Sequence, residues 1–238
     1  MLKDKTIFIT GSSRGIGAAT AKLAKKYGAK VTLHGKSESE ELKKLSKELD
    51  LPHVVFDVSD ERAVERGISK VGHIDILVNN AGINPSKAFQ ELTNKDWQEI
   101  FNTNLFGVVN VSRAVLKDMM KRKSGSIVNI ASIKGFPHVS GKPAYAASKA
   151  ALIRLTSSMA EEFAPYNIRV NAIAPGFTET EMTQATFSPK IKAQISRIPL
   201  KRMAKPEEIA EAILFASSDK ASYIIGQTLA VDGGLSIV

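Results

Sequence analysis

The segment Tyr145–Lys149 reads Tyr-Ala-Ala-Ser-Lys and carries a phenol and an ammonium group at positions i and i+4. Residues at this spacing lie on the same face of an α-helix, so the two groups can act together. A free tyrosine has a pKa near 10 and exchanges protons poorly at neutral pH, and a shift of about 3 units, or about 4 kcal/mol, is needed to change that. The pair therefore predicts acid–base chemistry, although an exposed helical pair of the same residues is common by chance.

A glycine-rich stretch, Thr10–Gly17, predicts a binding site for phosphate groups. It reads Thr-Gly-Ser-Ser-Arg-Gly-Ile-Gly and stands between a strand pattern and a helical pattern. Glycine permits a tight turn and a close approach of the backbone to a pyrophosphate, and the next helix offers free N–H groups at its N-terminus. This strand–turn–helix context is typical of dinucleotide binding. The expected contacts are Gly11, Ser13, Arg14, Gly15, Ile16 and Gly17.

The end of the second predicted strand favours NADP(H) over NAD(H). NAD sites usually carry a carboxylate about 20 residues beyond the glycine-rich motif, where it binds the ribose 2′-hydroxyl. Here the chain reads Leu-His-Gly-Lys-Ser over residues 33–37. Lys36 and Arg14 are expected to flank a 2′-phosphate, with a hydrogen bond from Ser37. In an alternative interpretation Lys36 is a solvated loop residue and Glu38 supplies the carboxylate.

These residues need elements that bring them to one edge of a sheet. Short β-branched segments alternate with long amphipathic ones, and the strands are almost continuously apolar, as in a parallel sheet covered on both faces. The sequence predicts one α/β domain over residues 1–238, with a doubly wound (Rossmann) sheet of seven parallel strands and helices on both faces. The predicted strands are Thr6–Thr10, Lys30–His34, His53–Phe56, Ile76–Asn79, Ser126–Ile130, Ile168–Ala174 and Thr228–Val231. The predicted helices are Ala18–Tyr27, Glu38–Leu49, Glu61–Lys70, Lys95–Lys121, Tyr145–Phe163 and Pro206–Ser217.

Two further strand ends carry polar residues. Ser132 follows the predicted strand Ser126–Ile130, and the segment Asn79–Gly82 reads Asn-Asn-Ala-Gly. Right-handed crossovers place the ligand crevice at the carboxyl edge of such a sheet, so these residues are expected beside Tyr145. In chain order the glycine-rich turn, Asn-Asn-Ala-Gly, Ser132 and Tyr-x-x-x-Lys resemble the short-chain dehydrogenase/reductase family over essentially the whole chain.

The resemblance implies a hydride transfer between a nicotinamide cofactor and a carbonyl or alcohol carbon. Tyr145 would donate the proton to the carbonyl oxygen in reduction, or accept it in oxidation, and Ser132 would hydrogen-bond that oxygen. Lys149 would hold the nicotinamide ribose and, with the positive charge of the nicotinamide ring, favour the phenolate of Tyr145. Asn104 would hold a water that links Lys149 to solvent. Alternatively, Asn104 is an ordinary polar residue that bends its helix.

The resemblance also implies the remaining contacts of the cofactor. Asp57 would bind the adenine edge, Asn79 would pack beneath the cofactor, and Ile173 would lie near the carboxamide through its backbone. Asp57 has an alternative interpretation as a turn-forming acid, and two threonines near the nicotinamide have one as caps of the next helix. The other residues assigned to the cofactor site are Val58, Ala81, Gly82, Tyr145, Lys149, Pro175, Gly176, Thr178 and Thr180.

Within the family, the chain most resembles 3-oxoacyl-[acyl-carrier-protein] reductases of fatty acid biosynthesis. The segments Asn79–Ile83, Ala174–Thr183 and Val231–Gly234 carry this resemblance. It implies an acyl-thioester substrate and an acidic acyl carrier protein as a candidate partner. Sugar, polyol and other alcohol dehydrogenases share these segments, and after Ile83 the chain departs from the reductases. A non-catalytic cofactor-sensing protein is the remaining alternative.

Composition limits the other classes of function. The chain has a net charge of +9, but no aromatic residues interleave with its lysines, so we expect no nucleic-acid binding. Its longest apolar runs are far shorter than the roughly 20 residues that span a bilayer, so no membrane association is expected. It has no cysteine, which excludes thiolate metal sites, and no metal site is expected. No signal peptide is evident, so a cytoplasmic protein is expected. Family analogy implies a homotetramer.

The segment 181–199 is expected to form a lid over the substrate. It is long, contains Pro189 and Pro199, and lies between the predicted nicotinamide pocket and the last helix. Its apolar residues are expected either to line a hydrophobic substrate site or to pack the lid down. They are Met182, Phe187, Ile191 and Ile195.

Overall fold

The structure is a computed structural model that describes residues 1–85, 87–137, 142–184 and 188–237. Its strands are β1 (Thr6–Ile9), β2 (Lys30–Gly35), β3 (His53–Val55), β4 (Ile76–Asn79), β5 (Gly125–Ile130), β6 (Ile168–Pro175) and β7 (Thr228–Val231). All pairs are parallel, and the seven strands form one sheet in the order β3-β2-β1-β4-β5-β6-β7. The predicted doubly wound sheet is confirmed.

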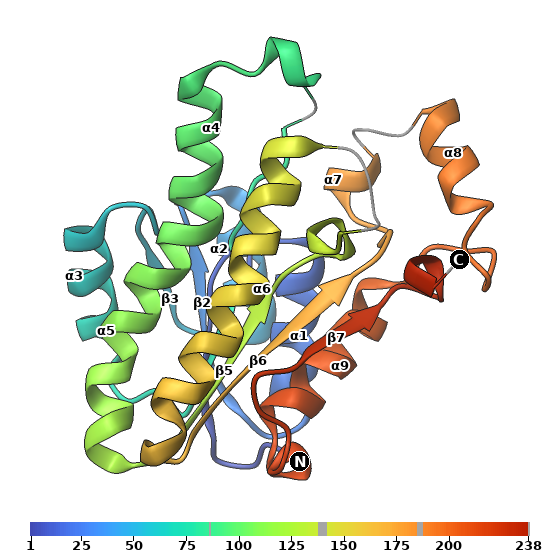
Figure 1. The fold of residues 1–238 in the computed structure, drawn as a ribbon. Helices are drawn as coiled ribbons and strands as arrows, with labels where there is room; N and C mark the ends of the chain where they lie inside the picture. Colours follow the sequence, from blue (N-terminus) through green and yellow to red (C-terminus); the bar gives the residue numbers. More distant parts are fainter. Residues whose placement is uncertain (86, 138–141, 185–187, 238) are drawn as a thin grey trace.

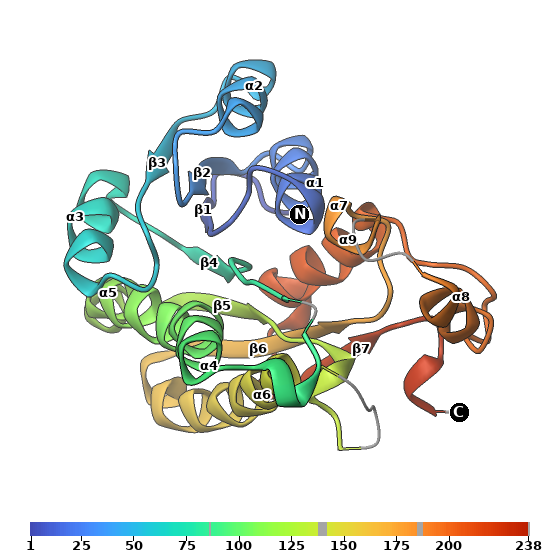
Figure 2. The same cartoon turned by 90° about the horizontal axis from the view of Figure 1, so that it is seen from above.

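Helices cover both faces of this sheet. They are α1 (Gly15–Lys26), α2 (Glu40–Leu49), α3 (Glu61–Val71), α4 (Asn94–Phe101), α5 (Gly107–Arg122), α6 (Pro143–Phe163), α7 (Glu181–Gln184), α8 (Pro189–Ile195) and α9 (Pro206–Ser217). Figure 1 shows the strands running together between the helices. Figure 2 shows the two layers from above, with α1, α2 and α9 on one side and α3, α4, α5 and α6 on the other.

Each layer is held by its own apolar cluster. Successive side chains of a strand point to opposite faces, so Ile7 and Ile9 of β1 belong to the cluster under α1 and α9, whereas Phe8 belongs to the cluster under α3 and α5. All three side chains are completely buried. Burial on both faces accounts for the almost continuously apolar strands.

The direction in which successive strands are added to the sheet reverses between β1 and β4. From β1 the chain winds outward to β2 and β3, and from β4 it winds the other way to β7. The loops that leave β1 and β4 therefore diverge to opposite faces and open a crevice at the carboxyl edge. This crevice is where the predicted site residues are required to meet.

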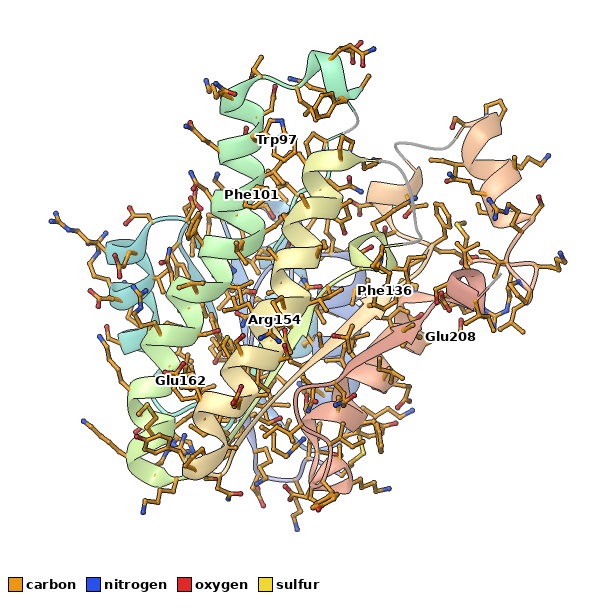
Figure 3. The ribbon with its side chains drawn as sticks, viewed as in Figure 1. Trp97, Phe101, Phe136, Arg154, Glu162 and Glu208 are labelled. Atoms are coloured by element: carbon orange, nitrogen blue, oxygen red, sulfur yellow. The ribbon has the colours of Figure 1, made fainter. Side chains whose placement is uncertain are left out.

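The predicted helix Lys95–Lys121 is interrupted at its centre. The structure has α4, then a π-helical turn over Asn102–Phe106, then α5. A π-turn is common at functional sites and adds a residue without ending the helix. On α4, Trp97 and Phe101 stack with ring centroids 6.1 Å apart, and Figure 3 shows both beside α6.

In the described part of the chain, none of the helices combines the length and the apolar character needed to cross a membrane.

Gly67 lets α3 pack directly on Phe56, which follows β3 and is 6% exposed. A Cβ added at Gly67 would collide with the Phe56 ring. Gly→Ala in an exposed helix interior normally stabilises by about 1 kcal/mol, but overpacking a core costs about 1–3 kcal/mol. We expect Gly67→Ala to lower the free energy of unfolding by about 1 kcal/mol in urea titrations.

Ser69→Ala, on the exposed side of the same helix, is the matched control and should be neutral or slightly stabilising. A Gly67→Ala protein more stable than the parent would show that the packing of α3 on Phe56 is looser than described.

Candidate active site

A cavity of about 420 Å³ opens at the carboxyl edge of the sheet. The loops after β1 to β6 line it, together with α6, α7 and α8. Of the residues assigned from the sequence, its lining contains Gly11, Ser13, Arg14, Gly15, Ile16, Lys36, Asp57, Val58, Ala81, Gly82, Ser132, Tyr145, Lys149, Pro175, Gly176, Thr178 and Thr180. Gly17, Ser37, Asn79, Asn104 and Ile173 lie outside this lining.

Asn80 holds the glycine-rich turn against β4. Its Nδ2 donates to the backbone oxygens of Thr10 (3.0 Å) and Gly11 (2.8 Å). The Thr10 hydroxyl in turn accepts from the backbone N–H groups of Asn80 and Ala81, both at 3.0 Å. Gly11 has φ +62°, and a Cβ there would lie 2.9 Å from the Ala81 Cα. The turn therefore depends on glycine at this position.

Asn79, expected beneath the cofactor, instead points into the layer between α5 and α6. Its Nδ2 donates to the Ser112 hydroxyl (3.0 Å) and to Asn129 Oδ1 (2.9 Å). Asn129 continues this buried network to the Thr156 hydroxyl at 2.9 Å. Because Asn79 is still a strand residue, its side chain follows the alternation of β4, whereas the next residue has left the strand and turns to the cavity.

The start of α1 fits a phosphate group. Arg14 occupies the N-cap position without a side-chain cap, and no acidic residue lies in the first turn. The first N–H groups of α1 therefore have no side-chain acceptor, and they carry positive partial charge. A Cβ at Gly17 would lie 2.5 Å from the Gly11 oxygen, so Gly17 lets α1 pack on the turn rather than touching a ligand.

His34, which sequence reasoning did not assign to the site, ties this turn to β2 and β3. Its Nδ1 accepts from the Gly11 N–H (3.0 Å), and its Nε2 lies 3.0 Å from the Phe56 oxygen. These contacts require a neutral ring with the proton on Nε2. Burial lowers the pKa of His34 to about 4. Only the adjacency of β2 to β1 and β3 brings these partners together, so no sequence motif marks this residue.

Lys36 and Asp57 form an ion pair where the loops after β2 and β3 line the cavity, called here its far end, with Nζ 2.8 Å from Oδ2. Burial acts to raise the pKa of the Asp57 carboxyl, but hydrogen bonds from Lys36 and Ser59 outweigh it and lower this pKa. The ion pair with Asp57 raises the pKa of Lys36. Asp57 also accepts from the Ser59 N–H (2.9 Å). It is thus a turn-forming acid and a cavity residue at once.

The alternative carboxylate, Glu38, is engaged elsewhere: its Oε1 lies 2.8 Å from His53 Nε2. Arg14, expected at the 2′-phosphate, pairs through Nη1 with Glu181 of α7 at 3.1 Å, and both side chains are more than half exposed. Ser37 is exposed beside the cavity. Arg14 and Lys36 thus both line the cavity at this end.

Ser132, Tyr145 and Lys149 meet at the opposite end of the cavity. Ser132 follows β5, and its oxygen accepts from the Lys134 N–H (3.2 Å) while it hydrogen-bonds the phenol of Tyr145. Lys149 is 4% exposed, and its Nζ donates to the Ile130 oxygen at the end of β5 (2.7 Å). The same Nζ lies 5.7 Å from the centroid of the Tyr145 ring.

Burial dominates the electrostatics of this trio. It raises the pKa of the Tyr145 phenol above its ordinary value, and the hydrogen bond from Ser132 opposes the rise only in part. Burial also lowers the pKa of Lys149 to about 8. Both shifts favour the neutral form, as expected when a charged group leaves water. The chain by itself therefore holds Tyr145 as a protonated donor. Lys149 was expected to lower the pKa of Tyr145, but the pKa of Tyr145 is raised instead.

Asn104 lies in the π-turn and is completely buried. Its Oδ1 accepts from the Ile83 N–H (2.8 Å), and its Nδ2 donates to the Ile83 oxygen (3.0 Å) and the Ser148 hydroxyl (3.1 Å). The side chain thus joins the loop after β4 to the helix that carries Tyr145. This makes Asn104 a positioning residue; its role in a proton relay stays a prediction.

The loop after β6 completes the cavity. The Thr178 hydroxyl donates to the Gly176 oxygen (3.2 Å), and the Thr180 hydroxyl accepts from the Thr183 N–H (3.4 Å), so Thr180 also caps α7. The Ile173 oxygen accepts from the Ala131 N–H (2.8 Å), which leaves it inside the sheet.

The predicted lid segment contains the two short helices α7 and α8. Ile191 of α8 lines the cavity, whereas Phe187 lies outside the described residues.

Comparison with known proteins agrees with this arrangement. A family model described as enoyl-(acyl carrier protein) reductase matches residues 11–236. The 3-oxoacyl-[acyl-carrier-protein] reductase FabG of Thermotoga maritima is 44% identical over 245 residues, which cover 99% of each chain. The fold and the site define a Rossmann oxidoreductase. The chain belongs to the short-chain dehydrogenase/reductase family.

Solved structures place the chain among several enzymes of this type. A putative gluconate dehydrogenase from Agrobacterium tumefaciens has a TM-score of 0.95 at 35% identity, with 100% of this chain and 98% of that one covered. A gluconate 5-dehydrogenase from Burkholderia cenocepacia, in complex with NADP and tartrate, has a TM-score of 0.94 at 35% identity, with 100% and 97% covered.

The lowered pKa of His34 makes part of the stability depend on pH. The unfolded ring has a pKa of 6.5 and the folded ring about 4, so between these values the unfolded state binds more protons. As pH falls from 6.5 to 4, we expect the free energy of unfolding to decrease by up to about 3 kcal/mol through His34. Denaturant titrations of the parent and His34→Phe across this range should differ by this slope.

Thr20→Val is the control, because Thr20 is buried in α1 and its hydroxyl donates to the Ile16 oxygen of the same helix, so the change removes no titratable group. It should follow the parent curve between pH 6.5 and 4 apart from a small offset. Parallel curves for the parent and His34→Phe would mean that His34 is not held neutral by the glycine-rich turn.

Proposed function

We propose that the chain reduces 3-oxoacyl thioesters with NADPH. The observation that carries this proposal is the trio of Ser132, Tyr145 and Lys149, which lines the same cavity as the glycine-rich turn. A protonated phenol is the form that a carbonyl reduction requires, and burial keeps Tyr145 in this form. The FabG relative from Thermotoga maritima is named for this reaction.

The bound cofactor would supply the hydride to the carbonyl carbon. The chain's own groups handle the oxygen. Ser132 donates a hydrogen bond to the carbonyl oxygen, which stabilises the charge that develops there, and Tyr145 transfers its proton to that oxygen. Lys149 remains anchored to the Ile130 oxygen and offers its other N–H donors to the cofactor ribose.

NADP(H) suits the charges at the far end of the cavity. Lys36 and Arg14 line it, and the carboxylate of Glu38, which follows β2, is bound to His53 and does not line the cavity. Each cation has one carboxylate partner, so each keeps donors for a 2′-phosphate. The gluconate 5-dehydrogenase from Burkholderia cenocepacia was solved with NADP.

The substrate end of the cavity has apolar walls from Ile133, Phe177 and Ile191. These walls suit the short acyl chain of a 3-oxoacyl thioester. Docking of an acidic carrier protein is part of the proposal. The basic segment 121–123 directly precedes β5, so it lies at the amino edge of the sheet, opposite the cavity, and does not mark the docking surface.

The homotetramer and the cytoplasmic location expected from the sequence stay part of this proposal. The alternative activity, NADP-dependent oxidation of a sugar or polyol derivative, uses the same trio. The two gluconate dehydrogenases among the similar structures are named for that kind of reaction. Substrate assays alone separate the two activities.

Tyr145→Phe removes the proton donor and little else. We expect kcat for an acetoacetyl thioester to fall by about 10²–10⁴-fold, the contribution of a positioned general acid, with little change in the dissociation constant of NADPH. Tyr223→Phe, at a fully exposed tyrosine, is the control and should leave both quantities unchanged. Full activity of Tyr145→Phe would remove the mechanism.

Cofactor choice is measured by equilibrium titration. The parent should bind NADPH at least about tenfold more tightly than NADH, because a hydrogen bond to a charged group contributes about 1.5–3 kcal/mol. Lys36→Ala and Arg14→Ala should each reduce this preference, and Lys47→Ala, an exposed lysine of α2, should not. Equal affinities in the parent would contradict the assignment of the far end of the cavity.

A further inference from the structure

Two ion pairs at the far end of the cavity cancel each other's charge. Lys36 Nζ lies 2.8 Å from Asp57 Oδ2, and Arg14 Nη1 lies 3.1 Å from Glu181 Oε2. All four residues line the cavity. A phosphate monoester carries about 1.5–2 negative charges at neutral pH. It gains the full attraction of a cation here only if one of the two carboxylates leaves its partner.

Asp57 is held by more than its ion pair with Lys36. Its carboxylate accepts from the Ser59 N–H (2.9 Å) and from the Ser59 hydroxyl (2.7 Å), and only 30% of its side chain is exposed. Without Lys36, this carboxylate would stay in the same turn as a partly buried charge without a cation, which is unfavourable. Asp57 therefore remains with Lys36.

Glu181, by contrast, is weakly held. In the described part of the chain its carboxylate bonds to Arg14 alone, and 61% of its side chain is exposed. Ion pairs this exposed contribute little to stability, because water solvates the separated groups almost as well. Glu181 is therefore the carboxylate that can leave its cation at low cost.

The backbone before Glu181 does not have to move for this to happen. The Glu179 N–H donates to the Ala204 oxygen and the Ala204 N–H donates to the Phe177 oxygen, both at 2.9 Å. A Cβ added at Gly15 would lie 3.3 Å from Thr180 Cγ2, so the residue before α7 already packs on the start of α1. Rotation of the Glu181 side chain alone is enough to release Arg14.

Arg14 gains by exchanging a carboxylate for a phosphate group. At the same distance a doubly charged anion attracts the guanidinium about twice as strongly as a carboxylate does. A guanidinium also binds phosphate oxygens through two parallel N–H groups. NAD(H) offers a 2′-hydroxyl in place of the phosphate, so Arg14 has no reason to leave Glu181 when NAD(H) binds.

We propose that Glu181 is a specificity-determining residue for the cofactor: it competes with the 2′-phosphate for Arg14 and weakens the binding of NADP(H), but not of NAD(H). This inference rests on the 2′-phosphate position given under the proposed function. Arg14 exchanges Glu181 for the phosphate when NADP(H) binds and returns to Glu181 when NADP⁺ leaves. Glu181 thereby limits how tightly the product cofactor is retained.

Fluorescence titrations with NADPH and NADH test this competition in the parent, Glu181→Gln, Arg14→Ala and the double variant. Glu181→Gln should lower the dissociation constant of NADPH by about three- to fivefold, the upper range for an exposed ion pair, and should leave that of NADH within about 1.5-fold of the parent. In the Arg14→Ala protein, the same change should alter the dissociation constant of NADPH by less than about 1.5-fold, because the cation under competition is gone.

The matched control is Glu61→Gln, because Glu61 forms a similarly exposed ion pair with Arg113 (2.8 Å) and neither residue lines the cavity. It should keep both dissociation constants of the parent. The competition is overturned if Glu181→Gln does not tighten NADPH, tightens NADH equally, or gives the same gain in the Arg14→Ala protein.

The parent separates this inference from the proposed function. If the parent prefers NADPH and reduces an acetoacetyl thioester, but Glu181→Gln gives one of the contrary results, this inference fails alone. If the parent binds NADPH and NADH equally, the proposed 2′-phosphate position fails together with it.

Discussion

The burial of a phenol and an ammonium group at one edge of the sheet is the constraint on which this site depends. Tyr145 and Lys149 leave water together on α6, and both are shifted toward their neutral forms. The end of β5 offsets part of this burial, because Ser132 bonds the phenol and the Ile130 oxygen accepts from the ammonium. Strand β5 and helix α6 must therefore keep a fixed relation, and the buried network from Asn79 through Asn129 to Thr156 joins the same two elements.

The strand order divides the cavity into two functions. On one side of the β1–β4 switch, the glycine-rich turn, Lys36 and Asp57 present backbone N–H groups and charges. On the other side, Ser132, Tyr145 and Lys149 present proton donors. Asn80 and His34 hold the turn between the two sides through hydrogen bonds to its backbone. Hydride transfer requires a fixed distance between the two halves of the cavity, and these two side chains fix the position of the glycine-rich turn.

Local patterns predicted most of the fold. Strands Ile76–Asn79 and Thr228–Val231 and helix Pro206–Ser217 have their predicted bounds, because apolar periodicity and a proline at the helix start are local signals. The π-turn at Asn104 was missed, since it adds a residue without ending the helix and depends on tertiary bonds to Ile83 and Ser148. For the same reason His34 and Asn80 were not assigned: their partners are distant in sequence, and only the strand order brings them together.

The account's central claim is that the chain itself keeps the Tyr145 phenol protonated beside Ser132. A pH titration of phenolate absorbance in the cofactor-free protein, taken as the difference between the parent and Tyr145→Phe, measures this pKa directly. The difference should titrate above 10.0, the ordinary value for tyrosine, because burial disfavours the phenolate. A phenol that ionises below 10.0 without cofactor would contradict the account.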